Sequence, residues 1–384
     1  MKKLGFVVLF FLSALLLAGC QEQKDYVTVE VKNIVGEVVF TERFEYPEDS
    51  DKPFIEIIDE AIDLDYSMSE YGAFVKGVAG IYPMETGISY NYWFGLYVNN
   101  EETQTGLDQV EYIPNMVISF IESSMLSPMD ALVDYIIYSF MNKRISDYIN
   151  LNKIDQYVLE ALILLNEHNY VSTDFQGFTY PTLSDTTLGN MIRIGLMNKS
   201  KDIDNSTLIS TLLSQDTTNV YEAISILNLM DILGVQHDNQ KRLDTLNILL
   251  TTIPQYMDVD FAGMALRALK SHVQDQSVQT FKESMINFIK SQQQEAGISA
   301  YDSVNSASTA MAIMGLVSVG LNPTDEAFTV GAHNLVSALL TFNIGNGFKY
   351  TLEDQTEDAN FATPQSIYAL VVYKIFRDLT TSPF

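Results

Sequence analysis

Apolar and polar residues alternate early in the chain, over residues 26–31 and again over 38–44. A period of two is typical of strands with one buried face, and the residues between the two runs, 33–36, favour a turn. Residues 54–63 carry apolar side chains at helical spacing. Further strand-like stretches lie at 74–81, 90–98 and 117–122. The pattern predicts a small α+β domain of β-grasp-like character over residues 25–123.

After Ser124 the apolar residues recur at intervals of three and four, the period of helices with one buried face. Glycine, proline, asparagine and aspartate mark short loops between these segments. The clearest helical segments are 157–165, 188–197, 220–233, 261–269, 307–319 and 367–376. Residues 125–384 therefore predict a helical domain, which makes the whole chain mostly α.

A weak internal repeat runs through this helical part. In each copy a polar lead-in and small residues precede a helix rich in leucine, methionine and isoleucine, most clearly at 305–316. A second, more amphipathic helix follows, as at 276–292. Short polar residues stand at the expected helix starts, where they cap free backbone N–H groups: Asp185, Asp260, Asn305 and Asn360. The repeat predicts a ring of helical hairpins with an inner and an outer layer.

The amino terminus has the layout of a signal peptide, since two lysines precede a short apolar run. The run ends in Leu17-Ala18-Gly19-Cys20, which resembles the bacterial lipobox. The resemblance implies removal of residues 1–19, lipid on Cys20 and a short linker over 20–24. It also implies an extracytoplasmic lipoprotein, anchored to a membrane at the cell surface through that lipid. An ordinary secretory signal with an incidental cysteine is the alternative.

Charge and cysteine content narrow the classes of function. The chain has 22 lysines and arginines against 49 aspartates and glutamates, a net charge of −27. Such an acidic chain argues against a nucleic-acid partner. Hydrophobic residues make up 47% of the sequence, enough for a packed core. Cys20 is the single cysteine, so neither a disulfide within the chain nor a cysteine-based metal site is expected.

Two stretches resemble known families. Residues 305–323 are similar to the repeats of the α/α toroid of terpenoid cyclases and prenyltransferases, which also occurs in bacterial surface proteins. The aromatic strand over 92–97, running into Asn99, resembles the small domain that ends transcobalamin and intrinsic factor. In that family the toroid and the small domain clamp a corrinoid between them. Here the small domain comes first, whereas in transcobalamin it comes last, so the linker geometry must differ.

The resemblance implies a transcobalamin-like surface lipoprotein. Such a protein would bind cobalamin or another corrinoid in a crevice between its two domains and pass it to a membrane transporter for uptake. Short polar side chains suit a ligand that carries many amide groups around an apolar macrocycle. The expected ligand-binding residues are Tyr92, Trp93, Asp185, Thr186, Asp260, Asn305, Ser308 and Gln365.

A purely structural role is the alternative for each of these residues. The helix-start residues can act as caps alone, and Gln365 can be a buried amide satisfied by a loop carbonyl. In the aromatic strand, a period of two places Tyr92 and Phe94 on one face and Trp93 and Tyr97 on the other. One of these faces must belong to the core.

Catalytic residues, a metal and a required cofactor are not expected. Zinc prenyltransferases hold their metal with an aspartate, a cysteine and a histidine, and the mature chain has only the lipidated cysteine. Protonating cyclases carry an aspartate-rich motif, and the nearest match, residues 258–261, lacks its closing aspartate. We therefore predict a binding protein that is not an enzyme.

The remaining alternatives concern the histidines and the class of function. His168, His237, His272 and His333 form no close pair along the sequence. They are interpreted as solvated or capping residues, with a corrinoid cobalt contact as the alternative. An adhesin that binds glycan or protein, and an enzyme acting on a terpenoid or polysaccharide, are the other classes that stay open.

Overall fold

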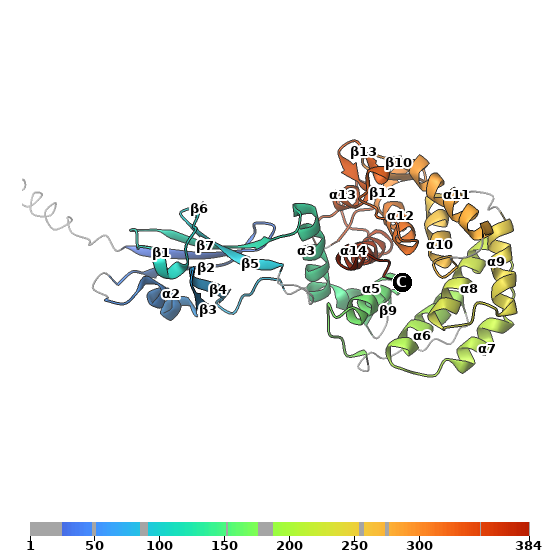
Figure 1. Ribbon diagram of the computed structural model, residues 1–384, viewed down its shortest axis with the longest axis horizontal. Coiled ribbons are helices and arrows are strands. Elements are labelled where there is room, and N and C mark those ends of the chain that lie inside the picture. Colours follow the sequence, from blue (N-terminus) through green and yellow to red (C-terminus); the bar gives the residue numbers. More distant parts are fainter. Residues whose placement is uncertain are drawn as a thin grey trace, which may run out of the picture. The chain divides into compact units, whose positions relative to one another are not determined.

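The computed structural model describes residues 25–47, 51–84, 91–150, 153–175, 187–252, 257–272, 276–345 and 347–383. The chain separates into two compact units, one of residues 1–85 with 90–126 and one of residues 86–89 with 127–384. The described residues form 13 α-helices and a small mixed sheet, so the predicted mostly-α class with some strands is confirmed (Figure 1). Within the described ranges, no helix combines the length and apolar character needed to cross a bilayer.

The first unit contains a five-stranded sheet in the order β2-β1-β7-β5-β6. β1 and β7 run parallel, and the other neighbouring strands are antiparallel. The elements are β1 Tyr26–Lys32, β2 Val38–Glu45, β5 Tyr92–Val98, β6 Glu101–Glu102, β7 Val117–Ser124, the hairpin β3 Leu64–Ser69 with β4 Gly72–Val78, the helix α2 Phe54–Ile62 and the 3-10 turn η1 Leu107–Gln109. The sequence pattern did not predict β3, because only Leu64 of its six residues is buried and the strand shows no apolar alternation.

One face of this sheet forms the core of the first unit. Val27, Val29 and Val31 of β1 alternate inward and are at most 1% exposed, and Ile58 of α2 belongs to the same cluster. The opposite face carries polar and half-buried side chains, among them Trp93 and Tyr97. Alternate residues of the aromatic strand β5 therefore face the core, and the residues between them lie on the uncovered face of the sheet.

The second unit holds most of the helices. They are α3 Pro128–Lys143, α4 Ile145–Tyr148, α5 Gln156–Glu167, α6 Leu188–Ser200, α7 Ser206–Ser214, α8 Val220–Ile232, α9 Gln240–Thr251, α10 Val259–Ala268, α11 Gln276–Gln292, α12 Ser306–Ser318, α13 Leu335–Leu340 and α14 Ala362–Leu379. Short hairpins link some of them: β8 Ile149–Asn150 with β9 Lys153–Ile154, β10 Gln293–Gln294 with β11 Gly297–Ala300 and β12 Ser303–Asn305, and β13 Thr329–Val330 with β14 His333–Asn334. A 3-10 turn, η3, spans Glu326–Phe328.

Six of these helices contact one another in a cyclic series. α5 packs against α6, α6 against α8, α8 against α10, α10 against α12, α12 against α14, and α14 returns to α5 (Figure 1). These are the six segments whose apolar spacing was clearest in the sequence. A second set packs against them: α9 on α8, α11 on α10, α13 on α12 and α3 on α14.

Small residues explain the closest contact in the series, between α10 and α12. A Cβ atom on Gly263 would lie 2.3 Å from the carbonyl oxygen of Met311, and one on Gly315 would lie 2.7 Å from the Cα of Gly263. Every residue of α12 is buried. The small residues of the repeat therefore let the two backbones approach, as the sequence pattern suggested.

Candidate ligand-binding site

Two carboxylates and a tyrosine meet at the amino-terminal end of α10. Asp258 is the N-cap of this helix, and its side chain accepts a hydrogen bond from the backbone N–H of Phe261. The Tyr301 hydroxyl donates to Asp258 Oδ2 at 2.8 Å and lies 3.3 Å from Asp260 Oδ2. A phenol has one proton to donate, so it cannot bond both carboxylates fully at once.

Tyr301 reaches this position from a strained turn. The hairpin of β11 and β12 turns through Tyr301 and Asp302, whose φ values are 52° and 63°. Non-glycine residues rarely adopt this left-handed region, and two-residue hairpins usually place asparagine or glycine there. A tyrosine at such a site, with 61% of its surface exposed, is a feature associated with function more often than with stability.

Asn305 and Ser308 begin the neighbouring helix α12. Asn305 Oδ1 accepts the N–H of Ser308 at 2.8 Å, and its Nδ2 lies 3.3 Å from the carbonyl oxygen of Ala300. Asn305 is completely buried, so the predicted capping role is confirmed and both side-chain atoms are already bonded. Ser308 is also fully buried, yet its Oγ has no hydrogen-bond partner of ordinary geometry.

Asp260 and Ser308 face each other across α10 and α12. Burial raises the pKa of Asp260, and the nearby charge of Asp258 raises it further, while the hydroxyls of Ser308 and Tyr301 act in the opposite direction. No hydrogen bond of ordinary geometry reaches Asp260 Oδ1 or Ser308 Oγ, although the Ser308 hydroxyl lies close enough to lower the pKa of Asp260. The site thus presents an acid that is poorly compensated and two buried polar atoms that interact only weakly with each other.

Two further tyrosines, Tyr221 and Tyr350, are close enough to the carboxylates to be influenced by their charge. Tyr221 of α8 is 45% exposed, and its ring packs edge-on against Phe261, with centroids 5.7 Å apart. Burial raises the pKa of Tyr221, and the charges of Asp258 and Asp260 act in the same direction. Burial and the charge of Asp260 likewise raise the pKa of Tyr350. We refer to Asp258, Asp260, Ser308, Tyr221, Tyr301 and Tyr350 as the acidic tyrosine site.

The other predicted helix-start residues differ from the expectation that each caps a helix. Asp185 and Thr186 fall outside the described residues, and Thr187 caps α6. Asp260 is not the cap of α10 but its second residue, because Asp258 takes the cap. Asn360 is exposed and precedes the start of α14, and its backbone N–H donates to Asp358 Oδ1. The prediction that Asp260 and Asn360 are caps was therefore wrong.

Gln365 lies in the first turn of α14, which packs against α12. Its backbone N–H donates to the Phe361 carbonyl at 3.2 Å. Its side-chain Oε1 is buried without a hydrogen-bond partner. A loop carbonyl can accept only from the Nε2–H group, so this observation does not decide between the two predicted roles. Gln365 stays a predicted ligand contact on a neighbouring helix.

The two predicted ligand residues of the aromatic strand β5, Tyr92 and Trp93, lie on opposite faces of the sheet. Tyr92 is 8% exposed and Phe94 is 7% exposed, and Phe94 belongs to the core cluster of the first unit. Trp93 lies on the opposite face and is half-buried. Of the two, Trp93 alone is on the uncovered side of the sheet.

Two histidines that are distant in sequence lie together. The rings of His237 and His272 are edge to face with centroids 5.1 Å apart, and His272 Nε2 lies 3.4 Å from Nε of the buried Arg242. His333 Nδ1 lies 3.3 Å from Ser337 Oγ, and His168 is the C-cap of α5. Spacing along the sequence could not reveal the His237–His272 pair, because a loop and two helices separate its members.

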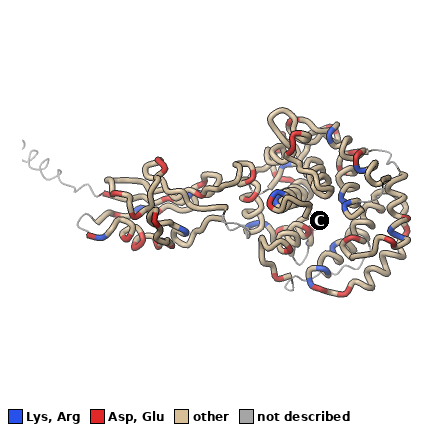
Figure 2. The backbone as a smooth tube through the Cα atoms, in the orientation of Figure 1, with Lys and Arg blue, Asp and Glu red and all other residues tan. Residues whose placement is uncertain are grey.

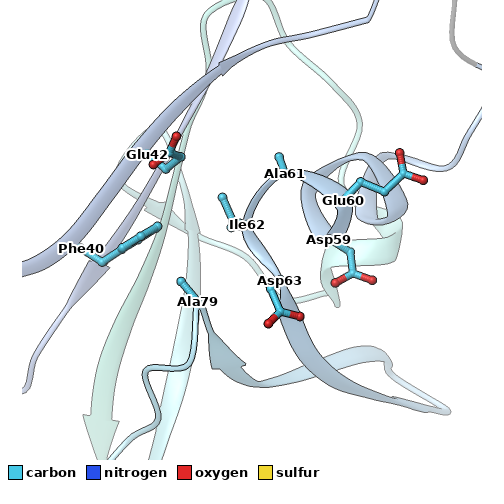
Figure 3. A pocket seen from close by; sticks show the side chains of 8 residues that line it. All are labelled: Phe40, Glu42, Asp59, Glu60, Ala61, Ile62, Asp63 and Ala79. Atoms are coloured by element: carbon cyan, nitrogen blue, oxygen red, sulfur yellow. The ribbon is translucent and has the colours of Figure 1, made fainter.

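A hollow of about 640 Å³ in the first unit is a second candidate (Figure 3). Glu42 of β2 and Asp59, Glu60 and Asp63 at the end of α2 contribute carboxylates to its wall. Local contacts occupy two of them, since Asp59 Oδ1 accepts the N–H of Leu64 and Glu60 pairs with Lys52. The carboxylates of Glu42 and Glu60 point away from each other in Figure 3. Throughout the described ranges, no three histidine, cysteine or acidic side chains form a group that could hold a metal ion.

Comparison with known proteins adds little to this geometry. No family model and no curated protein matches the chain. A crystal structure of a protein from Ruminococcus gnavus, provisionally described as metal binding, is similar to 27% of this chain and is covered over 100% of its own length, with 18% sequence identity and a TM-score of 0.21. A similarity at that level carries no functional argument, so the chemistry of the site rests on its own residues.

Sequence reasoning found part of the acidic tyrosine site and missed the rest. Asp260 and Ser308 were expected ligand residues, and the structure brings them together with Asp258. Tyr221, Tyr301 and Tyr350 were missed, because each lies on a different element and no spacing connects them. The one available signal was residues 258–260, noticed only as an incomplete aspartate-rich motif.

Proposed function

We propose that this protein is a surface lipoprotein that captures a small ligand at the acidic tyrosine site and delivers it for uptake, with a corrinoid as the specific ligand. The proposal includes an α/α toroid for the second unit, supported by the cyclic contacts of α5, α6, α8, α10, α12 and α14. It also includes a lipid anchor on Cys20 and a membrane transporter as receiver. No catalytic step forms part of this role.

The observation that carries the proposal is a set of buried polar atoms that lack a hydrogen bond of ordinary geometry. They are Asp260 Oδ1 and Ser308 Oγ at the site and Gln365 Oε1 on the adjoining helix. Each such atom costs about 1–3 kcal/mol if it stays unpaired. A ligand that brings hydrogen-bond donors removes that cost, which is how binding sites gain both affinity and orientation.

A corrinoid offers the donors that these acceptors lack. Its side chains end in primary amides, whose N–H groups can bond to Asp260 Oδ1 and Gln365 Oε1, while the Ser308 hydroxyl can donate to an amide oxygen. The exposed ring of Tyr301 supplies apolar surface beside these polar atoms. The chemistry of the site is therefore compatible with the ligand class that the resemblance implies.

Two serines of α12 provide a matched test. Ser308 and Ser318 are 0% and 4% exposed, but Ser318 Oγ donates to the Gly315 carbonyl at 2.7 Å whereas Ser308 Oγ has no partner. In an absorption titration of residues 21–384 with cyanocobalamin, we expect Ser308→Ala to weaken binding at least tenfold. Ser318→Ala should leave the affinity unchanged. Equal affinities for Ser308→Ala and the unmodified protein would contradict ligand capture at this site.

A glycan is the second candidate ligand, because exposed tyrosines stand beside carboxylates. Tyr301 and Tyr221 are 61% and 45% exposed, and sugar rings stack on aromatic faces while their hydroxyls donate to carboxylates. This is the adhesin alternative. Saturable binding of an oligosaccharide that Tyr301→Ala abolishes, with no response to corrinoids, would favour it.

A further inference from the structure

The acidic tyrosine site holds two carboxyl groups, and neither forms an ion pair with a described cation. The ion pairs of the described residues involve other acids, such as Glu160 with Arg267 and Asp134 with Lys374. Asp258 and Asp260 take part in none of them; their polar partners are Tyr301, Ser308 and the N–H of Phe261. Asp155 at the start of α5 also forms no ion pair, but its side chain accepts two backbone N–H groups.

Two like charges close together are costly when one of them is buried. Burial disfavours the charged form of a carboxyl group, and a neighbouring carboxylate disfavours it further. A single Tyr301 proton is shared between the two groups at 2.8 and 3.3 Å. The remaining Oδ1 of Asp260 is buried and accepts no hydrogen bond. A ligand with a positive charge and at least one N–H donor would therefore balance the charge of the two carboxyl groups and bond Asp260 Oδ1.

The surrounding rings suit a cation as well. Aromatic faces attract cations placed within about 6 Å of the ring centre, and the Tyr301 hydroxyl contacts both carboxylates. Burial raises the hydroxyl pKa values of Tyr221, Tyr301 and Tyr350, and the charge of Asp260 acts in the same direction. Carboxylates and aromatic rings together form the usual environment of a bound ammonium group. Metal ions are a weaker fit, because two carboxylates are too few ligands and the described residues hold no third histidine, cysteine or acid nearby.

We propose that the ligand group held at Asp258 and Asp260 is a protonated primary amine, which donates N–H bonds to Asp260 Oδ1 and lies against the rings of Tyr221 and Tyr301. A primary ammonium carries three donors, whereas a quaternary ammonium has none and would leave Asp260 Oδ1 unbonded. The inference rests on the proposed capture role of this site. A corrinoid offers neutral amide N–H groups there and no ammonium group, so the inference assigns Asp258 and Asp260 to a ligand class other than the corrinoid, and the two ligands compete for the same atoms. It predicts that charge, and not size alone, decides which small molecules bind.

The test compares two probes of matched length, 1,5-diaminopentane and 1,5-pentanediol, by calorimetry on residues 21–384 at neutral pH. We expect the diamine to bind at least tenfold more tightly than the neutral diol, and tetramethylammonium to bind more weakly than the diamine. Asp260→Asn should weaken diamine binding at least tenfold. It keeps the shape of the side chain, so the variant is expected to fold.

A control variant separates site binding from general attraction to an acidic protein. Asp204 is an exposed acid in the loop after α6, and its hydrogen bonds go to Ser206 and to the backbone of Asn205. Asp204→Asn removes the same charge and should leave the diamine affinity within twofold. Equal binding of diol and diamine, or equal losses in Asp204→Asn and Asp260→Asn, would overturn the inference.

The same protein then receives cyanocobalamin, so that the two proposals fail separately. Diamine binding without corrinoid binding would support the ammonium site and refute the corrinoid. Corrinoid binding without diamine binding would refute the ammonium site and leave the proposed function in place. Failure of both ligands would overturn both.

Discussion

Arg267 of α10 and Glu160 of α5 form a buried ion pair, with Arg267 Nη2 2.5 Å from Glu160 Oε2 and only 9% and 10% of the two side chains exposed. Their helices are not neighbours in the cyclic series of contacts. The same guanidinium lies 3.2 Å from the hydroxyl of Tyr368 on α14. One arginine therefore ties together three helices of the series.

Loss of one partner of this pair should strongly destabilise the second unit. Removing one member of a buried ion pair leaves the other charge unpaired, which costs about 3–5 kcal/mol. We expect Arg267→Met to lower the free energy of unfolding by that amount in a denaturant titration. The exposed pair of Lys52 and Glu60, whose side chains are 49% and 64% exposed, provides the control. Lys52→Met should cost less than about 1 kcal/mol, and similar losses for both variants would contradict the expectation.

Asp260 should make the protein less stable as pH rises. Its pKa in the folded state is raised above the ordinary value of 3.8, so across the interval between the two values the folded state holds more protons than the unfolded state. Stability then falls as pH rises through this interval and stays reduced above it.

The comparison of Asp260→Asn with the unmodified protein isolates this effect. The variant should be more stable at pH 7, by about 1 kcal/mol, the typical cost of a poorly satisfied buried group. At a pH well below 3.8 the difference should vanish, because both side chains are then neutral. Thermal unfolding at several pH values measures it, and an asparagine variant that is less stable at pH 7 would disprove the assignment of Asp260 as an uncompensated acid.

Tyr301 should lower the stability of the fold and strengthen ligand binding. Its φ of 52° costs a non-glycine residue roughly 1 kcal/mol, and asparagine tolerates this conformation better than tyrosine. We expect Tyr301→Asn to unfold at the same or a higher denaturant concentration while binding ligand at least tenfold more weakly. A variant that is both clearly destabilised and unaffected in binding would show that the turn serves the fold alone.

Alanine substitutions of the adjacent β5 residues Phe94 and Trp93 should change the stability of the protein to different extents. Phe94 is 7% exposed and packs edge-on against Phe120, with ring centroids 6.3 Å apart, so Phe94→Ala should cost about 3–5 kcal/mol of stability. Trp93 is half-buried on the opposite face of the sheet, and Trp93→Ala should leave stability nearly unchanged. A loss of stability as large as that of Phe94→Ala would contradict this assignment of the two faces.

Membrane attachment should depend on one atom, the Cys20 sulfur. The lipobox-like residues 17–20 predict that Cys20→Ser prevents lipid attachment and moves the protein from the membrane fraction to the soluble one. Fractionation of cells expressing each form measures this, and mass spectrometry identifies the diacylglycerol on the unmodified protein. A serine variant that stays with the membrane to the same extent would contradict the lipid anchor.

The sequence predicted the helices of the cyclic series well, because each has an apolar face of helical period and a short polar start. Asn305 illustrates this success, since its place before an apolar run identified it as a cap. Asp260 illustrates the limit, since the cap of α10 lies two residues earlier and only the backbone geometry distinguishes the two aspartates. Tyr301 could not be predicted at all, because its role depends on a strained turn that positions it over another helix.

The central claim, that this protein captures a corrinoid, is tested most directly by calorimetric titration of residues 21–384 with cyanocobalamin and cobinamide. Binding with a Kd of about 1 μM or tighter, equivalent to about −8 kcal/mol, is the result predicted here. No heat and no change in the visible spectrum with either ligand would contradict corrinoid capture and would direct attention to glycans as the alternative.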